Sequence, residues 1–207
     1  MTVVQRLLIL IGSAILGLVG LAGFNYVQIN KVYTATNFNS VNTLPSVLLL
    51  NDITAELSEI RASIWKHLTE TDDTALSTIE QKIDNNRASI DKLLKKYEQF
   101  LADDEDKKLF QEDLSHLAEY DSLRLKARDL SRLNKKAEAR DFIGNNQKQI
   151  DDLFAAFKEH SEYNSRLGDK SSAEAISIQS SALTISILIT LFTIGLISTI
   201  GFFMTRK

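Results

Sequence analysis

Two long uncharged segments constrain this chain more than any other feature. One runs from Leu7 to Val27 and the other from Ala182 to Met204, and apart from the weakly acidic Tyr26 neither contains an ionisable side chain. At about 1.5 Å per helical residue, each is long enough to cross about 30 Å of hydrocarbon. We therefore predict two transmembrane helices, one near each end of the 207-residue chain.

The first segment has an alternative interpretation as a cleaved signal peptide, because a basic residue, Arg6, precedes it and small residues lie along it. Its length favours a transmembrane helix, since the apolar run of a signal peptide has about 7–15 residues. Basic residues flank both segments on the outer sides, with Arg6 before the first and Arg206 and Lys207 after the second. The positive-inside tendency therefore places both ends of the chain in the cytoplasm.

These assignments divide the chain into five parts. They are a cytoplasmic N-terminus (1–6), a first transmembrane helix (7–27), an external domain (28–181), a second transmembrane helix (182–204) and the start of a cytoplasmic part (205–207). The external domain holds all 27 acidic residues and 21 of the 24 basic ones, a net charge of -6. This balance argues against a nucleic-acid partner. With no cysteine in the chain, helix packing must stabilise the domain.

The external domain has the composition and periodicity of packed helices. It contains one proline, Pro45, and two glycines, Gly144 and Gly168, which are too few chain breakers for a loop-rich or β fold. Apolar residues recur at alternating spacings of three and four. The clearest such positions are Leu50, Ile53, Leu57, Ile60 and Ile64 in a first stretch; Leu76, Ile79, Ile83, Ile90, Leu93, Tyr97 and Phe100 in a second; Phe110, Leu114 and Leu117 in a third; and Ile143, Ile150, Leu153 and Phe157 in a fourth.

Three polar stretches separate these four helices. They lie near Asp72, Asp103 and Asn134, and an Asp at such a break can cap the helix that follows. Four helices joined by short turns run antiparallel to their neighbours. The predicted fold class is therefore all-α, an antiparallel up-down-up-down four-helix bundle between two transmembrane helices. The first and fourth helices continue from the membrane segments, and Pro45 is expected to kink the first.

Polar residues interrupt the apolar stripes at one level of the bundle. Arg61 lies at the edge of the first stripe, Asn86 and Asn146 fall in the second and fourth, and the third stripe leads into Arg124 and Arg128. All lie about 15–20 Å from the end of the bundle farthest from the membrane. Since guanidinium groups bind carboxylates in a planar, bidentate geometry, we predict a pocket for a small organic anion.

Each of these residues also has a structural interpretation. Arg124 and Arg128 could pair with Asp121 and Asp129 on a solvated face, and the third stripe could shift to an apolar seam. That seam would comprise Tyr120, Leu123, Ala127 and Leu130. Asn86 and Asn146 could fix the register of a bundle core.

For Arg61 the structural alternative is an ion pair with Glu56 or Glu59, or stacking on Trp65 one turn later. Three histidines lie too far apart in sequence, with no cysteine, to support a metal site. No motif of a nucleophile with its base or of a phosphate loop is present, so we expect neither enzymatic activity nor a cofactor.

The sequence resembles the N-terminal sensory part of bacterial methyl-accepting chemotaxis proteins with a four-helix-bundle periplasmic domain. The resemblance covers the whole chain. It is carried by FNYVQINKVY at the end of the first apolar segment, VNTLPSVLLLNDITAELSEIR with Pro45 and Arg61, and FFMTRK at the end of the second. In such receptors a HAMP helix pair and a signalling domain follow, so the resemblance implies a fragment that holds the sensor and the membrane helices only.

The resemblance implies a multi-pass inner-membrane receptor, homodimeric, with its domain in the periplasm and its kinase coupling in the cytoplasmic part. Leu48, Leu49 and Leu68, apolar beside the core, also favour self-association. In the family an arginine of the first helix and polar residues at the start of the fourth bind ligand near the distal end. Arg61 matches that arginine, and RDFIGNNQKQ supplies the fourth-helix positions.

The candidate ligand-binding residues come from the polar positions and from the resemblance together. They are Arg61, Trp65, Arg124, Arg128, Phe142, Asn145, Asn146 and Gln147. Aspartate-binding members carry further first-helix arginines, where this chain has SIWKHL. The expected ligand is therefore a dicarboxylic or tricarboxylic acid rather than aspartate.

Two other functions use the same architecture. The chain could be the input half of a membrane histidine kinase or of a cyclic-dinucleotide enzyme, which only sequence beyond Lys207 distinguishes. It could also be an adaptor that recognises a periplasmic protein, which predicts an exposed apolar patch on the bundle instead of a pocket.

Overall fold

The computed structural model describes residues 2–205, and all regular elements in that range are helical. They are α1 (Val3–Phe38), the π-helical turn η1 (Asn39–Thr43), α2 (Leu44–Thr69), α3 (Asp73–Tyr97), the 3-10 turn η2 (Glu98–Phe100), α4 (Asp104–Arg132), α5 (Lys136–Asn145) and α6 (Gln147–Thr205). They form two compact units. One contains the chain up to Asn39 and from Asp169 onward, and the other contains Ser40–Gly168.

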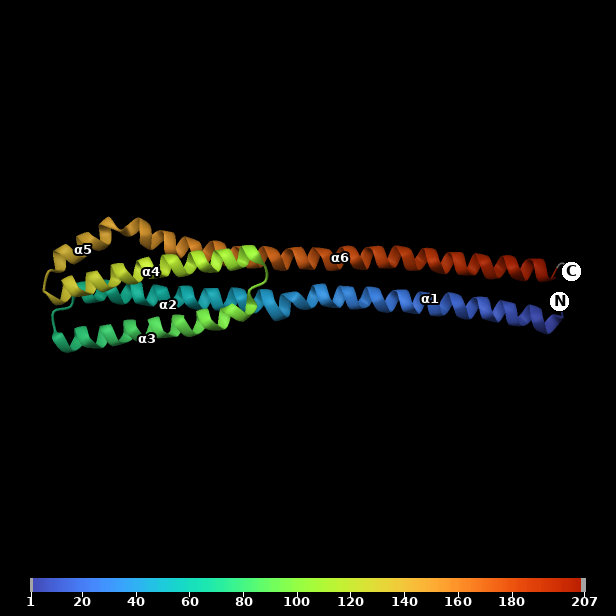
Figure 1. The fold of residues 1–207 in the computed structure, drawn as a ribbon, viewed down its shortest axis with the longest axis horizontal. Helices are drawn as coiled ribbons and strands as arrows, with labels where there is room; N and C mark the ends of the chain where they lie inside the picture. Colours follow the sequence, from blue (N-terminus) through green and yellow to red (C-terminus); the bar gives the residue numbers. More distant parts are fainter. Residues whose placement is uncertain (1, 206–207) are drawn as a thin grey trace. The chain divides into compact units, whose positions relative to one another are not determined.

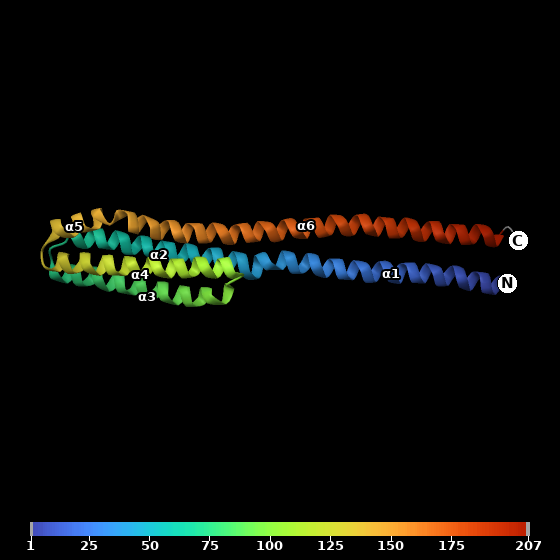
Figure 2. The ribbon, with the colours of Figure 1, turned by 45° about the horizontal axis from the view of Figure 1, so that its top comes forward.

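The Ser40–Gly168 unit is a four-helix bundle. Figures 1 and 2 show α2 and α3 running antiparallel, α4 returning beside them, and α5 with the first part of α6 forming the fourth helix. Short turns join consecutive helices, which forces each one to reverse direction. The predicted all-α, up-down-up-down fold is confirmed.

The helix boundaries follow the predicted caps. Asp72 accepts a hydrogen bond from the backbone N–H of Ala75 at 2.8 Å and begins α3, and Asp103 accepts one from the N–H of Asp106 at 2.9 Å and begins α4. Each carboxylate binds a backbone donor that has no partner within the helix. The third break is also where it was expected. Asn134, after α4, has φ 58°, a left-handed conformation that Asn adopts more readily than most residues.

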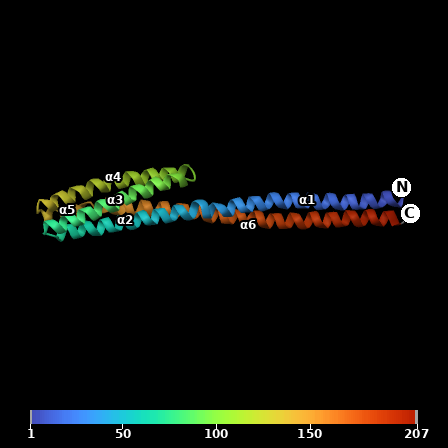
Figure 3. The same ribbon diagram turned by 90° about the horizontal axis from the view of Figure 1, so that it is seen from below.

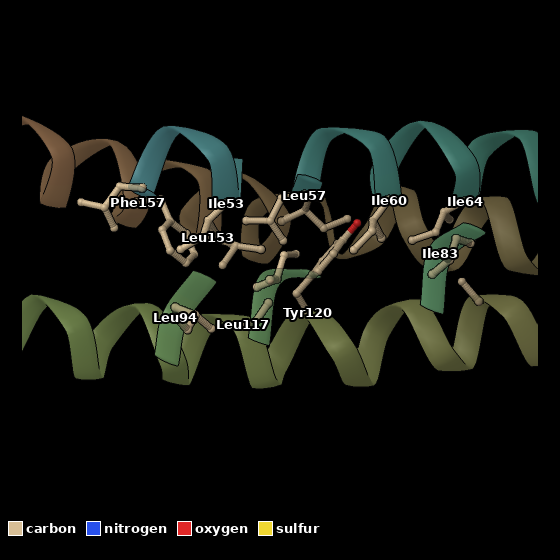
Figure 4. Close-up of a cluster of buried hydrophobic side chains, with 14 of the residues drawn as sticks. Ile53, Leu57, Ile60, Ile64, Ile83, Leu94, Leu117, Tyr120, Leu153 and Phe157 are labelled. Atoms are coloured by element: carbon tan, nitrogen blue, oxygen red, sulfur yellow. The ribbon is translucent and has the colours of Figure 1, made fainter. Parts of the chain in front are cut away.

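The core of the bundle consists of the predicted stripes. Figure 4 shows Ile53, Leu57 and Ile60 of α2 interdigitating with Leu117 of α4 and Leu153 of α6. All five are at most 2% exposed. Burial of a side chain of this size stabilises the fold by about 1.5–3 kcal/mol.

The register of α4 combines the two sequence interpretations. Tyr120 and Ala127 are buried, as the shifted apolar seam requires, yet Arg124 is also largely buried at the edge of that seam. The self-association argument needs a correction, because Leu49 and Leu68 belong to the core and only Leu48 is exposed. Their apolar character therefore serves folding of the monomer, as the second seam that a bundle helix needs to contact two neighbours.

The first bundle helix is distorted where proline was expected to kink it. Pro45 is the second residue of α2, and the π-helical turn Asn39–Thr43 immediately precedes it. Proline has no N–H to donate, and its ring clashes with the carbonyl one turn earlier. A locally widened helix places that carbonyl elsewhere and lets the chain continue as helix.

The fourth bundle helix differs from the prediction. We expected one helix with Asn146 in its core register, but α5 ends at Asn145 and α6 begins at Gln147. The Asn146 side-chain amide donates to the Phe142 carbonyl at 2.7 Å. This bond replaces the backbone bond of a continuous helix, since the Asn146 N–H bonds to Gly144 and Ile143 instead. From Gln147 onward the helix is unbroken to Thr205.

The other unit pairs α1 with the C-terminal part of α6, which lie side by side in Figures 1–3. The Ser186 hydroxyl donates to the Asn25 side chain at 2.7 Å, and Ser171 donates to the Ala35 carbonyl at 2.6 Å. Gly17 permits close approach, because a Cβ there would collide with the Thr193 methyl group. By length and composition, α1 and α6 each contain a stretch that could cross a membrane.

Candidate functional site

Arg61 lies at the boundary between α2 and α6. It follows the buried Ile60, so its side chain leaves the edge of the α2 seam toward α6. The Nη2 atom lies 3.8 Å from Oδ1 of Asp151, and the guanidinium carbon lies 5.5 Å from the centre of the Phe154 ring. The Arg61 side chain remains 39% exposed and that of Asp151 60%. An ion pair this open contributes about 1 kcal/mol or less.

The structure disfavours the alternative partners of Arg61. Glu56 accepts a hydrogen bond from Ser89 at 3.0 Å, and Glu59 pairs with Lys82 at 2.7 Å, so both interact with α3. The ring that lies beneath the guanidinium is Phe154, not Trp65. Arg61 therefore contacts the helix that continues into the second apolar stretch.

Gln147 belongs to the same cluster as Arg61. Its side-chain amide donates to Asp151 Oδ1 at 2.7 Å, the oxygen that faces Arg61. Trp65, one turn after Arg61 on α2, is 38% exposed. Sequence reasoning missed Asp151 and Phe154, although their spacing from Gln147, four and seven residues, places all three on one face of α6.

A buried hydroxyl lies near Arg61 and Arg124. Tyr120 is 1% exposed, and its hydroxyl has no hydrogen-bond partner among the residues that the structure describes. Figure 4 shows its ring crossing the core with the oxygen beside Ile60, the neighbour of Arg61. Burial raises the pKa of Tyr120, and the charges of Arg124 and Arg61 offset part of that rise. The charges of the two guanidinium groups thus both favour the ionised form of the same buried hydroxyl.

Arg124 and Arg128 are engaged elsewhere. The Arg124 Nε donates to Asp121 at 2.5 Å, and its Nη1 lies 3.8 Å from Asp84 of α3. Arg128 lies 3.5 Å from Asp129. These are the ion pairs with Asp121 and Asp129 that the sequence offered as the alternative to ligand binding. Within the described part of the chain, neither residue forms an ion pair with Asp151, the partner of Arg61. A fourth arginine, Arg87, also binds Asp121, at 2.8 Å.

The other candidate residues lie where α5 meets α6. Phe142 is partly buried, with the Lys126 ammonium 4.8 Å from its ring centre. Asn145 is exposed at the end of α5, and Asn146 closes that end as described above. The structure places these three residues beside Gln147 in the chain, on a helix end rather than on the continuous helix we expected.

A buried polar cluster connects α2, α3, α4 and α5 at the end of the bundle where α2 turns into α3. His67 is 1% exposed, with Nδ1 at 2.8 Å from the Ser131 hydroxyl and Nε2 at 3.0 Å from Glu80. The Lys136 ammonium donates to both the Ser131 hydroxyl and the His67 carbonyl. Hydrogen bonding by Arg132, the largest cause, lowers the pKa of Glu80 to about 2.

A second buried cluster lies where α3 ends and α4 begins. His160 of α6 is fully buried, with Nε2 at 2.7 Å from Asp106 and Nδ1 at 2.6 Å from Asp113. The Tyr97 hydroxyl donates to Asp106 at 2.6 Å, and the Asn164 amide donates to the same oxygen at 3.0 Å. Sequence reasoning missed this cluster because its members lie far apart in the chain.

Comparison with known families identifies the module. Residues 1–178 match the family model described as a four helix bundle sensory module for signal transduction. No match was found among curated proteins or among solved structures. The match covers α1, the whole bundle and the first part of α6. The chain belongs to the four-helix-bundle sensory modules of methyl-accepting chemotaxis proteins, which act as chemoreceptor sensors in signal transduction.

Proposed function

We propose that this module senses a small dicarboxylic or tricarboxylic acid, which binds against Arg61 on the wall formed by α2 and α6. The observation that carries the proposal is the weak pairing of the Arg61 guanidinium. Its side chain is 39% exposed, and its Nη2 atom comes no closer than 3.8 Å to Oδ1 of its partner Asp151. A ligand carboxylate can approach closely enough to form the two parallel hydrogen bonds that a guanidinium favours.

Two other arginines of the bundle, Arg124 and Arg132, are less available than Arg61. Arg124 is 10% exposed in its side chain and bonds to Asp121 at 2.5 Å, and Arg132 makes two bonds of 2.7 Å to Glu80. Extracting either would break a close, charge-assisted hydrogen bond to a carboxylate. Arg61 has only an exposed pair to lose, which supports it as the ligand contact.

The surroundings of Arg61 suit an organic acid. Gln147 supplies an amide donor that currently bonds to Asp151, and Phe154 and Trp65 supply apolar surface. A ligand with two or three carboxylates needs a second cationic contact. We propose that a second copy of the chain supplies it, in a homodimer.

An apolar stripe supports the homodimer. Leu44 and Leu48 are each more than half exposed and lie four residues apart on one face of α2, and Val41 in the preceding π-helical turn is also more than half exposed. Such a stripe is also what an adaptor for a periplasmic protein would present. We propose that this stripe serves self-association, as the family resemblance of the sequence implies.

A single introduced cysteine tests the homodimer, because the chain has none of its own. We expect Leu48→Cys to form an intermolecular disulfide on mild oxidation, since residues at a two-fold contact can bring their Cα atoms within about 7 Å. The control is Leu125→Cys, a partly exposed leucine on α4. Non-reducing electrophoresis of the full chain in detergent measures both. No disulfide at position 48, or equal yields at both positions, would contradict the dimer.

Transmission follows from the continuity of α6. Asp151 and Phe154 contact Arg61 in the bundle, and the same helix runs unbroken to Thr205 through its apolar stretch. A ligand that replaces Asp151 at Arg61 changes the contact between α2 and α6. The ligand shifts the equilibrium toward a conformation with a displaced α6 only if it binds that conformation more tightly than the original one.

The membrane topology is part of the proposal. The segments 7–27 and 182–204 span the inner membrane of a bacterium, residues 28–181 lie in the periplasm, and residues 1–6 and 205–207 lie in the cytoplasm. The uncharged stretches in α1 and α6 and the flanking basic residues support this topology.

Substitution of Arg61 tests the ligand site. We expect the full chain in detergent to bind citrate or succinate by titration calorimetry, and Arg61→Ala to weaken that binding about tenfold to a hundredfold. A hydrogen bond between charged groups contributes about 1.5–3 kcal/mol, which corresponds to this range. Arg61→Lys keeps the charge but loses the bidentate geometry, so its effect should be intermediate.

Arg140→Ala is the matched control, because Arg140 is an exposed arginine on α5, whereas the Arg61–Asp151 pair joins α2 to α6. Its affinity should equal that of the parent chain. The proposal fails if no dicarboxylate or tricarboxylate binds, or if Arg61→Ala binds as tightly as Arg140→Ala.

A further inference from the structure

A hollow lies between α4 and α6, and its lining is acidic. It encloses about 200 Å³. Four carboxylates line it, Glu112 and Asp113 from α4 and Asp152 and Glu159 from α6, together with His116 of α4. Leu109, Ala155 and Ala156 provide an apolar wall. The hollow therefore combines negative charge with a surface that can contact hydrocarbon.

One carboxylate oxygen in this lining is buried without a partner. Asp113 is 1% exposed, and its Oδ2 lies 2.6 Å from His160 Nδ1. Its Oδ1 has no hydrogen-bond partner among residues 2–205. Buried polar groups are paired in the great majority of cases, and leaving one unpaired costs about 1–3 kcal/mol. The missing partner of Oδ1 must be a hydrogen-bond donor.

The charged groups around the hollow leave it negative. Lys108 lies 3.8 Å from Glu112, and Lys148 bonds to Asp152 at 2.6 Å, but both lysines are exposed at the rim. His116 faces Glu119 at 3.8 Å. Behind Asp113, the charge of His160 is shared with Asp106. Within residues 2–205, neither of these lysines forms an ion pair with Asp113 or Glu159.

The geometry points to a site for a small primary alkylammonium ion, with its N–H groups donating to Asp113 Oδ1 and to the carboxylates of Glu112 and Glu159. A primary ammonium has three donors, and its alkyl chain would contact Leu109, Ala155 and Ala156. A metal ion fits less well, because no group of three or more His, Cys, Asp or Glu side chains in residues 2–205 is arranged to hold one.

Burial of Asp113 explains why a cation would bind here rather than at an exposed carboxylate. Burial raises the pKa of Asp113, and the hydrogen bond with His160 opposes that rise. A cation against Oδ1 would stabilise the ionised form inside the bundle, where attraction between charges is stronger than in water. The bound ion would also join α4 to α6.

This site is separate from the carboxylate site at Arg61. Asp151 and Phe154 point from α6 toward α2, whereas Asp152, Ala155 and Glu159 line the hollow beside α4. The two sites have opposite charge preferences and share α6 only. An ammonium ion bound beside α4 therefore offers the sensor a second input on the helix that carries the first.

Titration calorimetry of the full chain in nonionic detergent at pH 7 tests the site with n-butylammonium chloride. We expect binding that Asp113→Asn weakens at least about tenfold, because the substitution removes the charge that the ammonium pairs with. Glu159→Gln should also weaken it. Glu59→Gln, at an exposed carboxylate paired with Lys82 on the other side of the bundle, should leave it unchanged.

Two further measurements distinguish a charge-specific site from nonspecific apolar binding. Ala156→Phe fills the hollow and should abolish binding. If Trp65 fluorescence shows that Asp113→Asn does not fold, the result for Ala156→Phe decides the test. n-Butanol, uncharged and of the same length, should not bind. Arg61→Ala should bind n-butylammonium as the parent does. The site is overturned if n-butylammonium does not bind, if n-butanol binds equally, or if Ala156→Phe retains the parent affinity.

Discussion

The His160→Leu variant is expected to unfold with a free energy about 3–5 kcal/mol below that of the parent chain. His160 is fully buried, and its two ring nitrogens face two different carboxylates, Asp106 at 2.7 Å and Asp113 at 2.6 Å. Leucine fills a similar volume but provides no donor. Both carboxylates would then lie in the core without their shared cation, which is the costly outcome of breaking a buried ion pair.

The geometry indicates that His160 is protonated in the folded chain. A neutral imidazole has one N–H, whereas two carboxylates need two donors, one from each ring nitrogen. Asp106 has further donors in the Tyr97 hydroxyl and the Ala102 N–H, at 2.6 and 2.7 Å. Asp113 depends on His160 alone for its Oδ2. The loss of His160 therefore affects Asp113 more than Asp106.

Urea unfolding followed by Trp65 fluorescence measures this effect. Trp65 is the only tryptophan of the chain and lies in the bundle, so the signal reports on the bundle while the apolar helices remain in detergent. The control is His116→Leu, because that side chain is 34% exposed and its nearest carboxylate lies at 3.8 Å. We expect it within about 0.5 kcal/mol of the parent. Equal losses in the two variants would rule out the buried cation.

The unfolding free energy of the parent chain is expected to fall by about 3 kcal/mol between pH 6.5 and pH 9. Burial by itself lowers the pKa of His160, but the hydrogen bonds and charges of Asp106 and Asp113 outweigh it and raise the pKa from 6.5 to about 9. A group with a raised folded pKa contributes its full stabilisation below the unfolded pKa and loses it as the pH rises through the folded pKa. Each pKa unit corresponds to about 1.4 kcal/mol.

The His160→Leu variant serves as the control for this pH dependence. It should show little change over the same interval, because its buried carboxylates have no imidazole to release a proton. His67 does not obscure the result. Burial, the largest cause, lowers the pKa of His67, so its own transition lies below pH 6.5. A parent chain whose stability is flat from pH 6.5 to 9 would show that His160 is neutral at the start.

The helices of this protein could be read from local patterns. The stripe that includes Ile53, Leu57 and Ile60 is buried as its spacing predicts, because three- and four-residue spacing places side chains on one face of any helix. Asp72 and Asp103 mark helix starts, since a cap involves only residues three positions apart. The family resemblance needed this architecture together with local segments such as the one that contains Pro45 and Arg61.

The candidate site was predictable only in part. Arg61 stood out as an arginine at the edge of an apolar stripe, and Gln147 of the predicted fourth-helix segment bonds to the Asp151 oxygen that faces Arg61. Its actual partners, Asp151 and Phe154, depend on the rotation of α6 about its axis. That rotation changes at Asn146, where a side-chain bond to a carbonyl interrupts the helix. Sequence periodicity assumed that the helix was continuous there.

The class of this protein follows from local sequence patterns: two apolar helices, four amphipathic ones between them, and the turns that reverse them. These features arise from residues within one or two helical turns of each other. Which polar residues meet depends on the packing of helices that are distant in the sequence. His160 reaches Asp106 across 54 positions and His67 reaches Ser131 across 64. Such pairs depend on how helices pack against one another, because a buried charge is stable only where another helix supplies its partner.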